Sequence, residues 1–183
     1  MTRAALELSA LTFQRPGNIR GMEWEEVDLE RALWTIPAAK MKRTLHGKVN
    51  GHPHFVPLAK RAVDVLREVH PLSGHGRYVF PSLLSGEKCM SENTLRAALR
   101  RMGYSNDEMT PHGFRAMART ILVEELGANP DVIEAQLAHG KSGPLGSAYD
   151  RAAFMAERRK MMGQWADYLG SLALKAGPQR SMS

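Results

Sequence analysis

The sequence predicts a mainly α-helical domain with one small antiparallel β-sheet near its N-terminal end, an α+β fold. Short strand-like apolar segments cluster between residues 26 and 57, whereas later apolar residues recur at helical spacing. No Gly/Pro-rich linker divides the 183 residues, and 43% of them are hydrophobic, so the chain is long enough to bury one core.

The N-terminal third is expected to supply the sheet. A helix is predicted over Ala4–Phe13, because Pro16 and Gly17 interrupt the helical pattern after it. Asn18 is expected to cap a short helix toward Trp24. Three short β-prone segments follow, and we expect them to pair as antiparallel strands: Val27–Leu29, Ala32–Ile36 and His54–Pro57.

The rest of the chain is expected to be helical. Helical spacing of apolar residues predicts helices over Leu58–Val69, Ser91–Met102, His112–Leu126, Pro130–Ala138 and Arg151–Leu174. Ser91 is a candidate N-cap, and Pro111 and Pro130 each follow a capping residue, the usual order at a helix start. Residues 176–183 are small and polar, and we expect a disordered tail there.

Positive charge is concentrated in one segment. The net charge is +6, but residues 1–30 hold three basic and six acidic side chains, whereas residues 31–63 hold seven basic and no acidic ones. A phosphate backbone attracts such a local excess, although a solvated basic surface is an alternative. The single cysteine excludes an internal disulfide and fits a reducing compartment. The sequence contains no run of about 18 apolar residues, the length that would indicate a membrane-spanning helix.

Several residues have types that suit phosphate chemistry. His112 and Arg115, three apart, share one face in the first turn of a predicted helix, where backbone N–H groups favour an anion. His139 stands at a predicted helix end, Tyr149 follows a Gly/Ser-rich loop, and Arg15 stands at a helix–turn junction. Each of these has a structural explanation when taken alone. His46, His52 and His54 have no carboxylate or thiol nearby in sequence, so no metal site is expected.

Taken in chain order, six residues resemble the catalytic set of the tyrosine recombinase, or phage integrase, family: Arg15, Lys42, His112, Arg115, His139 and Tyr149. The surrounding motifs are similar too: Arg-Pro-Gly, Met-Lys, His-Gly-Phe-Arg, Leu-Ala-His and Ala-Tyr-Asp-Arg-Ala. The resemblance spans residues 4–170 and is greatest to integrases of prophages and genomic islands. It implies the catalytic-domain fold over residues 1–175, with the family's N-terminal core-binding domain absent.

The resemblance implies a site-specific DNA recombinase that needs no metal, cofactor or ATP. Tyr149 would attack the scissile phosphate to give a 3′-phosphotyrosyl link, and a 5′-hydroxyl of another strand would reseal the DNA. Lys42 would be the general acid for the leaving 5′-oxygen.

The other four residues would surround the phosphate. Arg15 and Arg115 would clamp it, because a guanidinium offers a permanently charged, bidentate fork that lysine cannot replace. His112 and His139 would transfer protons or contact the phosphate, since imidazole titrates near neutrality.

Two features depart from the family pattern. Asn18 stands where an acidic residue usually supports the first arginine. The segment after Lys42 is long, so Lys40 and then Lys48 are competing candidates for the general acid. Lys40, Arg43 and Lys48 are also expected to bind DNA.

The resemblance further implies double-stranded attachment-site DNA as the partner and a tetramer of the full-length protein on that DNA. It also implies a monomeric isolated domain in the bacterial cytoplasm, associated with the nucleoid. The apolar stripe of Ala166–Leu174 could pack within its own chain or on a neighbour. Two alternatives stay open: a type IB topoisomerase-like enzyme that relaxes DNA, and a non-catalytic DNA-binding derivative, which Asn18 would favour.

Overall fold

A three-stranded antiparallel sheet lies beside the first helix. Its strands, in spatial order, are β1 (Val27–Asp28), β2 (Leu33–Ile36) and β3 (His54–Pro57). In the β2–β3 pair Trp34 lies opposite Val56, and both side chains are fully buried. Alternate residues of a strand point to the same face, so Trp34 and Ile36 both enter the core. The predicted sheet is confirmed.

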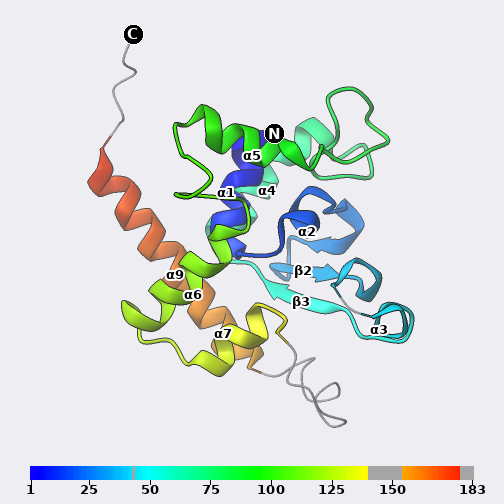
Figure 1. The fold of residues 1–183 in the computed structure, drawn as a ribbon. Helices are drawn as coiled ribbons and strands as arrows, with labels where there is room; N and C mark the ends of the chain where they lie inside the picture. The colour runs from blue at the N-terminus through cyan, green and yellow to red at the C-terminus, as the bar shows by residue number, and fades with distance from the viewer. Residues whose placement is uncertain (43, 140–153, 178–183) are drawn as a thin grey trace.

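Helices make up most of the remaining structure, as predicted (Figure 1). The computed structural model describes residues 1–42, 44–139 and 154–177. The helices are α1 (Thr2–Thr12), α2 (Pro16–Arg20), α3 (Leu45–Val49), α4 (Lys60–Ser73), α5 (Asn93–Arg101), α6 (Gly113–Glu124), α7 (Pro130–Gln136) and α9 (Met155–Ala176). Short 3₁₀ turns, η1 (Trp24–Glu26) and η2 (Ala38–Lys40), flank the first two strands. Among the described helices, none combines the length and apolar character that crossing a membrane requires.

Two of the predicted N-cap residues, Asn18 and Ser91, do not cap a helix. α2 begins at Pro16, so Asn18 lies inside it and Arg15 is the N-cap, because proline's fixed φ suits the first helical position. α5 begins at Asn93 after Glu92, and the Ser91 hydroxyl bonds the Thr94 hydroxyl at 2.9 Å instead of capping the helix.

Two other segments are also corrected. α6 begins at Gly113, because the Thr110 hydroxyl accepts the Gly113 N–H at 3.1 Å and closes a turn before the helix. The segment between Lys42 and β3 contains α3, which no apolar pattern predicts; the Thr44 hydroxyl caps it by accepting the Gly47 N–H at 3.3 Å.

Two apolar clusters form the core. The first joins α1, the sheet, α4 and α5, with Leu8, Trp34 and Leu66 fully buried. The second joins α6, α7 and α9 around Leu122 and Trp165. Fully burying a side chain of this size stabilises the fold by roughly 1.5–3 kcal/mol. Together the clusters fix the backbone on two sides of the site described below.

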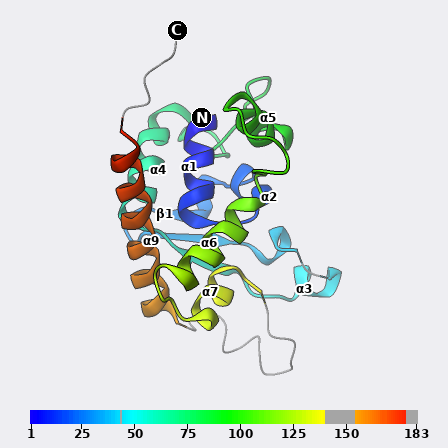
Figure 2. The same ribbon diagram turned by 60° about the vertical axis from the view of Figure 1, so that its left-hand side comes forward.

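The C-terminal helix packs on its own chain. Figure 2 shows α9 alongside α1 and α4. The Trp165 indole N–H donates to the Ala10 carbonyl at 2.9 Å, and its ring meets Phe13 edge to face at 6.2 Å. Ala166 and Leu169 also pack against the core, whereas Leu174 is exposed. The first part of the predicted apolar stripe is therefore used within the chain.

Candidate active site

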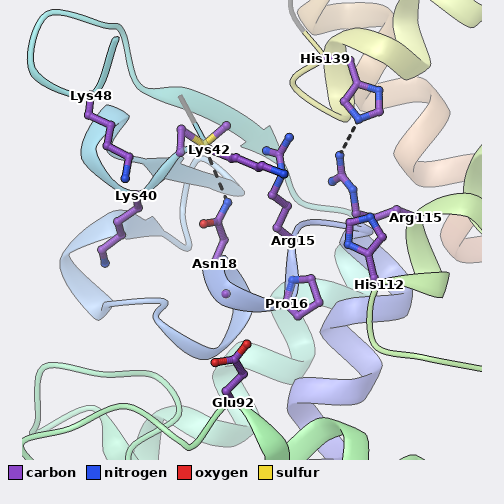
Figure 3. Close-up of a pocket in the computed structure, with 12 residues that line it drawn as sticks. Arg15, Pro16, Asn18, Lys40, Lys42, Lys48, Glu92, His112, Arg115 and His139 are labelled. Carbon is purple, nitrogen blue, oxygen red and sulfur yellow. Dashed lines mark hydrogen bonds between the residues drawn. The ribbon is translucent and has the colours of Figure 1, made fainter. Parts of the chain in front are cut away.

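A basic pocket of about 690 Å³ opens beside α2 and the start of α6 (Figure 3). Seven of its lining side chains are basic and one is acidic. The lining residues are Arg15, Pro16, Gly17, Asn18, Lys40, Met41, Lys42, Lys48, Glu92, His112, Arg115 and His139. Five of the six predicted catalytic residues thus meet in one pocket, although they come from four separate segments. Tyr149, and Arg43 among the predicted DNA contacts, lie outside the described residues.

Arg15 is held by the turn between α1 and α2. Phe13 ends α1 in the left-handed conformation, with φ of 41°, and so redirects the chain. The Arg15 carbonyl then accepts the N–H groups of Asn18 and Ile19 at 2.8 and 3.0 Å, which opens α2. The guanidinium extends into the pocket, as Figure 3 shows.

Arg115 lies at the back of the pocket and is only 4% exposed. Its Nη1 donates to the Phe13 carbonyl at 2.9 Å, and its Nη2 donates to the Leu137 carbonyl at 2.8 Å and to His139 Nε2 at 3.1 Å. Burial, and then the positive charge of Arg15, lower the pKa of Arg115 to about 10. The guanidinium is still charged near neutral pH, so an anion arriving here would be stabilised by two neighbouring arginines.

His112 lies at the pocket rim and is the N-cap of α6. Its pKa is lowered by partial loss of hydration and then by the nearby charges of Arg115 and Arg15. Near neutral pH its imidazole is therefore mostly uncharged. Both His112 and Arg115 line the pocket, as their spacing predicted.

His139 reaches the pocket because α7 ends in a left-handed residue, Ala138, with φ of 52°. This conformation folds the chain back, and the His139 N–H donates to the Glu134 carbonyl at 3.0 Å. The ring then lies with Nδ1 2.7 Å from the Glu134 carboxylate and Nε2 toward Arg115. Sequence reasoning missed Glu134, since residues five apart do not meet on a regular helix.

The competing lysines differ in their partners. Lys40 Nζ donates to the Gly21 carbonyl at 2.8 Å and to the carboxylates of Glu23, at 2.7 Å, and Glu26. These carboxylates are 3% exposed, so Lys40 is tied into the protein. In Figure 3 the Lys40 ammonium points away from Arg15, whereas Lys42 points toward it. These contacts favour Lys42 over Lys40 as the lysine that would face an anion beside Arg15.

Asn18 bonds to the segment that carries Lys42. Its buried side-chain amide donates to the Met41 sulfur at 3.8 Å. Met41 is itself buried and immediately precedes Lys42. The amide therefore contacts the residue that precedes Lys42.

A buried polar network behind the pocket was also missed by sequence reasoning. The Gln136 carbonyl accepts from Gln14 Nε2 at 2.8 Å and from His54 Nε2 at 3.1 Å. Arg158 donates to the Gln136 side-chain oxygen through Nε and Nη2 at 3.0 and 2.8 Å. This network ties α9, β3 and the chain after α1 to the end of α7, which carries His139. Its members are separated by up to 144 residues in sequence, so no local pattern predicts it.

Comparison with known proteins identifies the family of this chain. Residues 1–155 match the model of the phage integrase family. The chain belongs to this family. It is 40% identical over 176 residues to the integrase of Enterobacteria phage P4, covering 92% of this chain and 40% of that protein. It is 39% identical over 166 residues to prophage integrase IntA of Escherichia coli, covering 91% of this chain and 38% of that protein.

Solved structures show the integrase fold. An integrase from mycobacterium phage Brujita superposes with a TM-score of 0.67 at 18% identity, covering 90% of this chain and 51% of that one. XerA recombinase superposes with a TM-score of 0.55 at 17% identity, covering 86% and 62%. The predicted family and fold are confirmed. This integrase-family chain spans about two fifths of the length of the two curated relatives.

Proposed function

We propose that this integrase-family chain is the catalytic part of a site-specific DNA recombinase and that Tyr149 is its nucleophile. The observation that carries the proposal is the pocket itself. It gathers Arg15, Arg115 and Lys42 from three distant segments, with one acidic side chain, Glu92, among its lining residues. Such a site suits a reacting phosphodiester, whose negative charge grows in the transition state.

The two arginines would act on the non-bridging oxygens. Arg115 is preorganised, since two backbone carbonyls hold its guanidinium plane before any DNA arrives. Among the described residues these carbonyls and His139 take three of its five N–H groups, which leaves two for phosphate. In Figure 3 the Arg15 guanidinium lies beside that of Arg115, so a phosphate in the pocket would accept hydrogen bonds from both planar cations.

The reaction would proceed by two transfers at phosphorus. The Tyr149 oxygen bonds to phosphorus, the bond to the 5′-oxygen breaks, and Lys42 gives that oxygen its proton. A 5′-hydroxyl of another strand later attacks the phosphotyrosyl link and releases Tyr149. Each step exchanges one phosphodiester for another, so neither ATP nor a metal ion is needed.

The proposed partner is double-stranded attachment-site DNA in the bacterial nucleoid, bound by a tetramer of the full-length protein. The isolated chain is proposed to be a monomer. Light scattering should give one mass near 20.3 kDa, and a stable tetramer without DNA would contradict this.

Covalent trapping tests the central proposal. Nicked duplexes made from host DNA fragments should yield a denaturant-resistant adduct with the wild-type chain and none with Tyr149→Phe. An equal yield from Tyr149→Phe would show that another residue is the nucleophile. Relaxation of a supercoiled plasmid that lacks any sequence selected in this trapping would instead indicate a topoisomerase-like activity. Adduct formation by wild type would exclude a non-catalytic DNA-binding derivative.

A further inference from the structure

A chain of charged groups runs from the surface of α6 to the pocket. Arg119 Nε donates to one oxygen of Glu134 at 2.7 Å, and the other oxygen lies 2.7 Å from His139 Nδ1. His139 Nε2 lies 3.1 Å from Arg115 Nη2. Glu134 is thus bonded on both oxygens, and His139 is bonded on both ring nitrogens.

These contacts fix which ring nitrogen of His139 carries the proton. Burial raises the pKa of Glu134, but hydrogen bonds from Arg119 and His139 outweigh burial and hold this pKa below its usual range. The carboxylate is therefore ionised near neutral pH and only accepts hydrogen bonds, so Nδ1 must be the donor. Arginine only donates, so Nε2 must be the acceptor.

We propose that Glu134 is a positioning residue of this pocket: its carboxylate holds His139 in the tautomer protonated at Nδ1, so that Nε2 is turned toward Arg115 and the phosphate site. The inference rests on the proposed function and deepens it. It assigns what orients His139, the residue to which the proposed function gives a role in proton transfer or phosphate contact.

Charge balance explains why a carboxylate is needed at this position. Protonating Nε2 creates an imidazolium in a pocket that is already strongly positive. The cations that face it are Arg15, Lys42 and Arg115, with His112 and Lys48 also in the lining. Glu134 is the carboxylate in direct contact with His139, and it offsets the new charge at 2.7 Å. Arg119 lies on the far oxygen of Glu134 and balances the carboxylate while His139 is neutral.

The tautomer can be read in the free protein without any DNA. Long-range ¹H–¹⁵N spectra distinguish protonated from unprotonated ring nitrogens, and His139→Gln identifies the His139 signals. We expect Nδ1 protonated and Nε2 unprotonated in wild type, and a mixture of tautomers in Glu134→Ala. A His139 ring protonated at Nε2 in wild type, or spectra unchanged by Glu134→Ala, would overturn the proposal.

Cleavage rates test the consequence for catalysis. At saturating nicked DNA, Glu134→Ala should slow adduct formation about 10- to 100-fold, by analogy with the loss of a carboxylate that orients a metal-bound histidine. Glu134→Gln keeps the volume and an acceptor for Nδ1, so it should keep the tautomer but still slow cleavage through loss of charge. Both variants should bind DNA at least as tightly as wild type, because Glu134 is negatively charged and is not among the residues that line the pocket.

Two further comparisons distinguish this positioning role from a purely structural one. Arg119→Ala removes the other partner of Glu134 but leaves Nδ1 its carboxylate acceptor, so the His139 tautomer should stay as in wild type. In a His139→Ala background, Glu134→Gln should have no further effect. A full additional loss in that background would show that Glu134 does not act through His139. If wild type forms no adduct, the recombinase proposal fails, whereas the tautomer spectra still decide the role of Glu134.

Discussion

Lys40 and Lys42 are two residues apart, and their replacement should affect different properties. Replacing Lys40 should lower the stability of the fold, whereas replacing Lys42 should slow DNA cleavage. Lys40→Met removes the ammonium that bonds two nearly buried carboxylates. Glu23 would keep its ion pair with Arg77 at 2.9 Å, and Glu26 would keep the Trp34 indole N–H at 3.1 Å. Breaking a buried ion pair costs about 3–5 kcal/mol, and these surviving partners place the loss near the lower end, about 3 kcal/mol.

The size of this loss makes it easy to measure. For a chain of this length, a loss of about 3 kcal/mol lowers the melting temperature by roughly 6–12 °C. Lys42 is exposed, so Lys42→Met should change the free energy of unfolding by no more than about 0.5 kcal/mol. Urea denaturation of both variants, with wild type alongside, gives the comparison. Adding Glu26→Gln to Lys40→Met should recover part of the lost stability, because it removes one uncompensated charge.

Cleavage should rank the two variants in the reverse order. Loss of a general acid slows the reaction about 10²- to 10⁴-fold, and we expect this for Lys42→Met. A substrate with sulfur in place of the 5′-oxygen should restore its rate, because a thiol has a pKa of about 8.5 and leaves as the thiolate. Lys40→Met, assayed below its melting temperature, should cleave the ordinary substrate at nearly the wild-type rate. If instead Lys40→Met is stable, slow and rescued by the sulfur substrate, Lys40 is the general acid and the reasoning from its ion pairs is wrong.

Other predictions concern the scaffold of the site. Arg158→Met should lower the free energy of unfolding by about 2–4 kcal/mol, because it leaves buried acceptors unpaired. The control is exposed Arg159→Met, which should lower it by less than about 1 kcal/mol when both are measured by urea titration. Ala138→Gly should stabilise the protein by about 1 kcal/mol, since glycine adopts a positive φ freely. As the control, Ala135→Gly inside α7 should destabilise the protein by about the same amount in the same assay. A loss of stability in Ala138→Gly would contradict the left-handed helix end. The bond from Arg77 is the main reason that the pKa of Glu23 is lowered to about 2, against the opposing effect of burial and with further help from Lys40. The stabilisation from Glu23 should therefore be complete above pH 4.5 and lost as pH falls toward 2; thermal melts of Glu23→Gln should show a weaker acid dependence over this range.

The local pattern of the sequence predicted most of the elements. Antiparallel strands and amphipathic helices follow from apolar periodicity, and α7 begins at Pro130 with the Asn129 side chain as its cap, as the Asn-Pro pair indicates. Where two local signals competed, sequence reasoning chose the wrong one. Asn18 is a good capping residue, but Pro16 suits the first helical position and starts α2 two residues earlier.

The sequence by itself determined the family, the order of the candidate catalytic residues and the helix that carries Arg115, with His112 at its start, because each depends on residue identity and short spacing. Only the tertiary structure decided that Lys40 is bound to carboxylates and that Lys42 points toward Arg15. It alone brought Glu134 to His139, through a backbone turn at Ala138 that regular helical spacing does not describe. Contacts of this kind depend on how distant segments pack, and no local period encodes that packing.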